Sequence, residues 1–160
     1  MWMGLLIGRG FVLAGDLERA CRLGFDLTGR YDPRKFAPGA PRQFAWQISL
    51  WARYHKARAL ADAGRHRKAL SSLGAGFFAR GESRGLPLGI QARILTAHCM
   101  GKRGAYFLAA DEFNRAFREI EALRRRGGAE AEQAEALHRR ASHDIAEMIA
   151  TAVQAGVKLW

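Results

Sequence analysis

Cysteine, proline and long hydrophobic runs are all scarce in this chain of 160 residues. Its two cysteines, Cys21 and Cys99, supply neither a disulfide framework nor a metal-binding spacing. No stretch approaches the roughly 18 consecutive apolar residues that a membrane span needs. The apolar opening MWMGLLIGRGFVLAGD has no basic start and is interrupted by Arg9, so it predicts a core helix rather than a signal peptide. We therefore expect a cytoplasmic protein with no membrane partner.

Motifs of catalysis and cofactor binding are also missing. The sequence contains no G-x-S-x-G, no P-loop and no G-x-G-x-x-G, and its histidines show neither H-E-x-x-H nor a Cys–His metal spacing. His98 and Cys99 are adjacent, which on a helix turns their side chains about 100° apart. The sequence thus predicts that the protein is not an enzyme and has no catalytic residue, no cofactor and no metal site.

Acidic residues are nearly absent from the middle of the chain. Residues 33–103 carry fourteen basic side chains and only Asp62 and Glu82 as acids, whereas residues 1–32 and 104–160 are close to neutral. The net charge of +11 therefore comes from the middle segment. Such a concentration of charge attracts anionic partners, and the alternative is a solvated face that keeps the protein soluble.

Helical periodicity dominates what remains. Apolar residues recur at steps of three and four in GDLERACRLGFDLTG, QFAWQISLWARYHKARALADAG, AYFLAADEFNRAFREIEALRRR and the Ala-rich segment 129–157. No window alternates with a period of two, so no sheet is expected. Three of the four prolines lie in the loop YDPRKFAPGAPRQ, and Pro87 can serve as the first residue of a helix. These features predict one all-α domain over residues 1–160.

One spacing of small, apolar and glycine residues occurs three times. The copies are Gly8, Phe11, Gly15, Leu17 and Ala20; Ala57, Leu60, Gly64, His66 and Ala69; and Ala97, Met100, Gly104, Tyr106 and Ala109. Each predicts a helical hairpin, because the glycine ends the first helix and the final alanine lets the second helix approach it closely. We expect hairpins over about residues 2–30, 43–80 and 88–126, followed by a long helix over residues 129–157.

This spacing resembles the tetratricopeptide repeat, whose hairpin reads small–x2–aromatic–x3–Gly–x–aromatic–x2–Ala. The copies lie 49 and 40 residues apart, whereas the family repeats every 34 residues, and the Pro-containing loops account for the difference. The family's tryptophan is replaced by Gly4, Arg53 and Arg93. The resemblance implies a short right-handed stack of about three hairpins whose open end is capped by the C-terminal helix. A plain helical bundle is the alternative.

The resemblance also implies a concave groove lined by the first helix of each hairpin. The aromatic and cationic residues that this assigns to the groove are Trp2, Arg9, Trp51, Tyr54, Arg58, His98 and Lys102. Aromatic and arginine side chains are the types that anchor interfaces. The alternative is that Trp2 and Trp51 belong to the core.

Two functions follow from these patterns. The first is a non-enzymatic scaffold or adaptor that cradles an acidic or amphipathic segment of another protein in this groove. The second is a basic helical subunit of a ribonucleoprotein or other assembly with RNA or DNA, contacting the phosphate backbone. Its phosphate contacts would be Arg34, Lys35, Arg42, Arg53, Lys56, Arg58, Arg65, Arg67, Lys68, Arg80 and Arg84. The apolar stripe of the C-terminal helix also offers a dimer seam as an alternative to capping.

Overall fold

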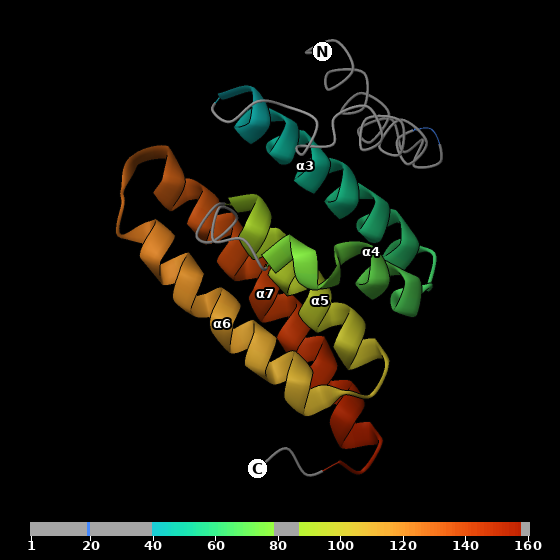
Figure 1. The fold of residues 1–160 in the computed structure, drawn as a ribbon. Helices are drawn as coiled ribbons and strands as arrows, with labels where there is room; N and C mark the ends of the chain where they lie inside the picture. Colours follow the sequence, from blue (N-terminus) through green and yellow to red (C-terminus); the bar gives the residue numbers. More distant parts are fainter. Residues whose placement is uncertain (1–18, 20–39, 79–86, 158–160) are drawn as a thin grey trace. The chain divides into compact units, whose positions relative to one another are not determined.

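The computed structural model describes residues 19, 40–78 and 87–157 (Figure 1). All regular structure in these ranges is α-helical, which confirms the all-α prediction for this part of the chain. The helices are α3 (Ala40–Asp62), α4 (His66–Phe78), α5 (Pro87–Lys102), α6 (Tyr106–Arg124) and α7 (Gly128–Gln154). Among these helices, none combines the length and the apolarity that crossing a membrane requires.

Some predicted features lie outside the described residues. These are the first hairpin over residues 2–30 and the site residues Trp2, Arg9, Arg34, Lys35, Arg80 and Arg84. Arg42 belongs to α3, but its side chain is also outside the described part.

The chain divides into two compact units, Met1–Leu73 and Gly74–Trp160. The division falls at a break in α4, where Gly74 has φ 56° and ψ 165° and is not helical. α3 and the first turns of α4 belong to the first unit, and α5, α6 and α7 to the second. The single helical-repeat domain expected over residues 1–160 stays a prediction.

The elbow between α3 and α4 has the geometry that the repeat predicts. Gly64 has a φ of +71°, and the N–H of Arg65 donates to the carbonyl of Leu60 at 2.8 Å, as in a Schellman motif. Gly64 is needed here because a left-handed residue with a side chain would be strained. Ala57 and Ala69, on either side of the elbow, are fully buried.

The elbow between α5 and α6 repeats this geometry. Gly104 has a φ of +79°, and the N–H of Ala105 donates to the carbonyl of Met100 at 3.0 Å. Ala97 and Ala109 are again fully buried. The two copies of the spacing that fall on described residues therefore form elbows of the same geometry, whereas the stack of hairpins expected from the tetratricopeptide resemblance stays a prediction.

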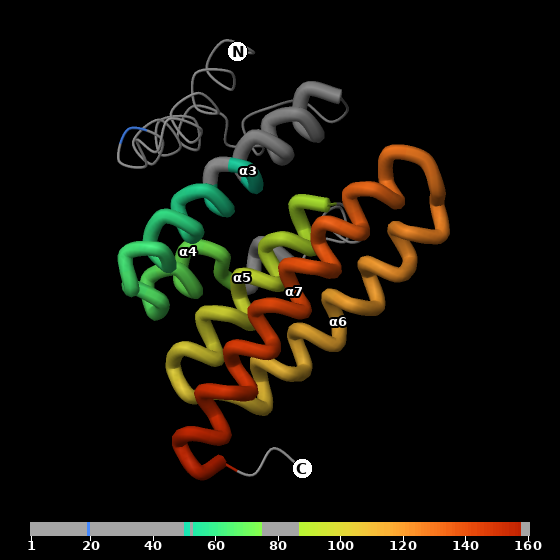
Figure 2. Tube along the Cα trace, turned by 180° about the vertical axis from the view of Figure 1, so that it is seen from behind, coloured from blue at the N-terminus to red at the C-terminus, as the bar shows by residue number. Residues whose placement is uncertain are grey.

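The three helices of the second unit, α5, α6 and α7, lie side by side (Figure 2) and share one core. Side chains on α5, α6 and α7 meet there: Ile90, Ile94, Ala97, Ala109, Phe113, Ala116, Ile120, Leu123, Ala134, Leu137, Ala141 and Met148. Fully burying a side chain such as Phe113 contributes about 1.5–3 kcal/mol. The predicted stripe of α7 lies in this core, so the chain itself covers the residues that a dimer seam would need.

Candidate functional site

The predicted groove residues of the first unit lie on one face of α3 and differ in exposure. Tyr54 is only 7% exposed, so it belongs to the packed interior. Trp51 is half-buried, and its ring centroid lies 4.4 Å from that of His55. Arg58 is half-buried and forms an ion pair with Asp62 one turn later, at 3.0 Å. Of the predicted groove residues on α3, Trp51 and Arg58 thus keep solvent-accessible surface that a partner can contact.

The predicted groove residues of the second unit meet acidic residues of their own chain. His98 and Lys102 lie one turn apart on α5, facing α7. His98 pairs with Asp144 at 3.8 Å between Nδ1 and Oδ1, and Lys102 donates a hydrogen bond to Glu147. Both side chains are therefore directed at α7.

The predicted basic patch is best seen at the elbow between α3 and α4. Arg65, Arg67 and Lys68 are all exposed, and no acidic side chain in the described ranges forms an ion pair with any of them. Arg53 and Lys56, on α3, are half-buried. The exposed cations of the described part of the patch are therefore the three within residues 65–68, around one turn.

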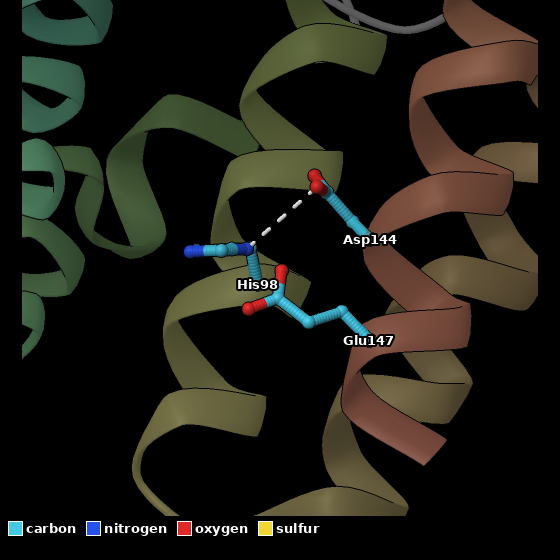
Figure 3. A group of neighbouring side chains, drawn as sticks. All are labelled: His98, Asp144 and Glu147. Carbon is cyan, nitrogen blue, oxygen red and sulfur yellow. Dashed lines mark ion pairs between the residues drawn. The ribbon is translucent and has the colours of Figure 1, made fainter. Parts of the chain in front are cut away.

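A cluster that the sequence did not predict lies between α5 and α7 (Figure 3). One ligand atom each from His98, Asp144 and Glu147 can be chosen so that all three lie within 4.8 Å of one another. Asp144 and Glu147 are three residues apart, which places both on one face of α7. Asp144 is buried, whereas Glu147 is exposed and His98 is intermediate. The three side chains border a small pocket that Gly101, Lys102, Met148 and Thr151 also line.

The close approach of α5 and α7 depends on Gly101. A Cβ at this position would lie 2.9 Å from Cγ of Met148, closer than real Cβ atoms come to their neighbours. Glycine in a helix interior costs about 1 kcal/mol relative to alanine. Its presence here brings α7 near enough for His98 and Lys102 to reach the acidic side chains.

Cations surround the two carboxylates of this cluster. The pKa of Glu147 lies below its ordinary value, chiefly because Lys102 donates a hydrogen bond to it and adds a positive charge. His98 and His143 lower the pKa of Glu147 further, against an opposing effect of burial. Arg140 approaches the other carboxylate, with 3.8 Å between its Nε and Oδ2 of Asp144. Glu147 is therefore ionised at neutral pH, with Lys102 as its cationic partner.

No local sequence pattern reveals this cluster. The pair Asp144 and Glu147 is visible as D-x-x-E, but His98 lies 46 positions before Asp144 and on another helix. Only the packing of α7 on α5 brings them together.

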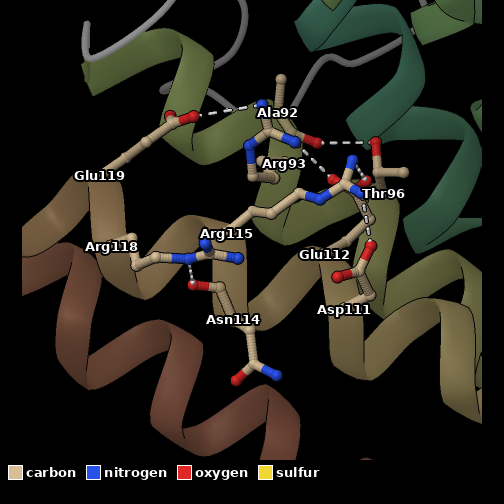
Figure 4. Close-up of polar contacts among 9 residues, drawn as sticks. All are labelled: Ala92, Arg93, Thr96, Asp111, Glu112, Asn114, Arg115, Arg118 and Glu119. Carbon is tan, nitrogen blue, oxygen red and sulfur yellow. Dashed lines mark hydrogen bonds and ion pairs between the residues drawn. The ribbon is translucent and has the colours of Figure 1, made fainter.

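A second polar network joins α5 to α6 (Figure 4). Arg93 is 9% exposed, and its guanidinium pairs with Glu112 at 2.6 Å and with Glu119 at 3.1 Å. Arg115 also pairs with Glu112, but from an exposed position. Because Arg93 is enclosed and both its acidic partners come from one neighbouring helix, this network serves packing rather than binding.

Comparison of the chain with protein-family models, with curated proteins and with solved structures gives no match. Functional inference therefore rests on the charges and contacts of the described residues.

Proposed function

We propose that this protein is a non-enzymatic scaffold that binds an acidic, amphipathic segment of a partner protein. The observation that carries the proposal is the elbow of the first unit, where Arg65, Arg67 and Lys68 are exposed and have no acidic partner among the described residues. Three such cations around one turn attract an anionic ligand and speed its association.

The contrast with the second unit supports this assignment. There, cations with acidic partners include Lys102, Arg115, Arg124 and Arg126. Acids on the same or the neighbouring helix thus offset much of that unit's positive charge. Within the described ranges the elbow cations have no such ion pairs, so their field extends into solvent.

Trp51 supplies the apolar part of the proposed interface. It is half-buried and lies on the same helix as Arg58, two turns away. Tryptophan and arginine are among the residue types enriched at the positions that dominate binding energy in protein interfaces. An amphipathic segment would place its apolar side against Trp51 and its acidic side toward the cations.

The two matching elbows support a tetratricopeptide-like arrangement as the scaffold. Gly64 and Gly104 have the same left-handed conformation, and the alanines that follow them are equally buried. In that arrangement the first helix of each hairpin would face the ligand.

Nucleic acid is the second candidate, favoured by the same elbow. Its cations lie at the N-terminal end of α4, where the helix dipole adds to the attraction for phosphate. Binding would then be directed at the backbone and tolerant of sequence.

A salt titration with two probes separates these functions. The probes are a fluorescent acidic amphipathic peptide and a single-stranded oligonucleotide of equal charge. The test variant replaces Arg65, Arg67 and Lys68 with alanine. A matched control removes the same charge from exposed arginines of the second unit: Arg103, Arg125 and Arg139.

For a protein partner, the elbow variant should lower the association rate of the peptide and its salt dependence, while the control triple should not. Trp51→Ala should cost about 1–2 kcal/mol of peptide affinity and leave the oligonucleotide unaffected. For nucleic acid, the elbow variant should reduce the slope of log affinity against log salt by up to about three. If neither probe binds the parent, or if the elbow triple and the control triple weaken both probes equally, both functions are wrong for this surface.

A further inference from the structure

The structure also carries a site that is independent of the proposed function. We propose that His98, Asp144 and Glu147 bind a divalent transition-metal ion of the zinc type between α5 and α7. The donors are one imidazole nitrogen and two carboxylates, and all three can be placed within 4.8 Å of one another.

The spacing of the donors is near what such an ion needs. Zinc binds imidazole nitrogen and carboxylate oxygen at about 2.0–2.2 Å, so two ligands of a tetrahedral ion lie about 3.3 Å apart. His98 Nδ1 and Asp144 Oδ1 are already 3.8 Å apart. Glu147 is exposed, so a change of its rotamer brings in the third ligand without moving a helix. A water molecule would complete the coordination.

The backbone holds the two helices in the position that this requires. The contact between Gly101 and Met148 sets the distance between α5 and α7. Gly101 lies one turn after His98 on α5, and Met148 directly follows Glu147 on α7. Asp144 is buried and so has little freedom to turn away. The packed helices therefore hold His98 and Asp144 in fixed positions. The small pocket beside them leaves no room for a molecule larger than an ion.

The donor set selects the kind of ion. An imidazole nitrogen favours Zn²⁺, Ni²⁺ or Cu²⁺ over Mg²⁺ and Ca²⁺, which prefer oxygen ligands throughout. No thiolate takes part, because the ligand atoms are an imidazole nitrogen and carboxylate oxygens. Zn²⁺ is consequently the probe of choice, with Mg²⁺ as the negative comparison.

Lys102 competes with the ion for Glu147. Its ammonium group makes both a hydrogen bond and an ion pair with that carboxylate, and Arg140 lies 3.8 Å from Asp144. With these cations in place the cluster is already neutralised, so the ion must displace Lys102. That side chain is exposed and can turn into solvent. Removing the Lys102 charge should therefore strengthen metal binding, an effect opposite to that expected if the cluster is only a set of ion pairs.

The test is calorimetric titration of the full chain, free of any histidine tag, with ZnCl₂ and with MgCl₂. We expect one Zn²⁺ per chain for the parent and no heat from Mg²⁺. His98→Gln and Glu147→Gln should each weaken Zn²⁺ binding about tenfold or more, and Lys102→Met should strengthen it. His138→Gln is the matched control, because His138 is on α7 but packs against Phe117 instead.

Circular dichroism of each variant verifies that the fold is retained, and Glu147 is exposed enough for its variant to fold. The visible spectrum of a Co²⁺-substituted sample gives a second reading, since loss of a nitrogen ligand in His98→Gln should change its absorption. The proposal is overturned if the parent binds no Zn²⁺, or if His98→Gln binds it as tightly as His138→Gln does. Weaker Zn²⁺ binding by Lys102→Met would also overturn it.

Discussion

Gly101 of α5 lies directly against Met148 of α7, so closely that a Cβ on the glycine would be 2.9 Å from Cγ of the methionine. Met148 is buried and cannot retreat into solvent. The same contact places His98 and Lys102 opposite Asp144 and Glu147. Packing and the polar cluster are thus consequences of one close approach between two helices.

Gly101→Ala should therefore destabilise the second unit even though alanine is the better helix former. Overpacking typically costs about 1–3 kcal/mol, which exceeds or offsets the gain of about 1 kcal/mol in helix propensity. The measurement is urea unfolding of the parent and variant. In a Met148→Ala background the clash is removed, so Gly101→Ala should become neutral or stabilising. A Gly101→Ala protein that is more stable than the parent would show that α5 and α7 are not this close.

Arg93 provides the second prediction. Its side chain is enclosed between Glu112 and Glu119. Arg93→Met therefore removes the cation that pairs with Glu119 and leaves Glu112 with Arg115 alone, at a largely buried place. We expect a loss of about 2–4 kcal/mol in the free energy of unfolding, since removing one partner of a buried ion pair is costly. Arg115→Met is the control, because that arginine is exposed and its ion pairs contribute about 1 kcal/mol or less.

Adding Glu112→Gln and Glu119→Gln to Arg93→Met should restore much of the lost stability, because the repelling charges are then gone. Equal stability of Arg93→Met and Arg115→Met would mean that the network contributes no more than a surface pair.

The sequence predicted those features that depend on neighbouring residues. Gly64 and Gly104 end their helices because glycine accepts a positive φ, and that preference is local. The stripe of α7 and the inner face of α6 follow from a period of 3.6 residues, so their burial was also foreseeable.

Features that depend on the packing of distant segments were not predicted. Arg93 stands where the tetratricopeptide pattern has tryptophan, and no local rule indicates that two glutamates of α6 would enclose it. His98 was assigned to a groove, but the packing of α7 places Asp144 in front of it. Tyr54 was assigned to the same groove from its position in the repeat, but its side chain is buried, and the spacing alone does not determine that.

Ala109 tests the hairpin register. It is fully buried in the core of the second unit, so Ala109→Leu should overpack the contact and cost about 1–3 kcal/mol. Ala122→Leu is the matched control on the same helix, because Ala122 is exposed and such changes usually stay within about 0.5 kcal/mol. Thermal or urea unfolding compares the two. If both variants unfold like the parent, Ala109 does not have to be a small residue for the two helices to pack.

His55 gives the last prediction, on pH. Burial lowers the pKa of this histidine from 6.5 to about 4, so the folded protein resists protonation that the unfolded chain accepts. Stability is therefore greatest above pH 6.5 and falls as the pH drops toward 4, because the unfolded state then binds more protons. Because His55 is only half-buried and solvent screens part of the effect, from pH 7.5 to pH 5 this one group should lower the free energy of unfolding by about 1 kcal/mol.

Urea unfolding at these two pH values measures the effect, monitored by tryptophan fluorescence. Trp51, one of four tryptophans in the chain, has its ring against that of His55. His55→Gln should reduce the difference in the free energy of unfolding between the two pH values, since glutamine does not titrate. His143→Gln is the control, because His143 is exposed and its replacement should leave the pH dependence close to that of the parent. Equal pH dependence in the parent and in His55→Gln would show that the imidazole is protonated as readily in the folded protein as in the unfolded chain. His55 would then not be buried in the folded protein.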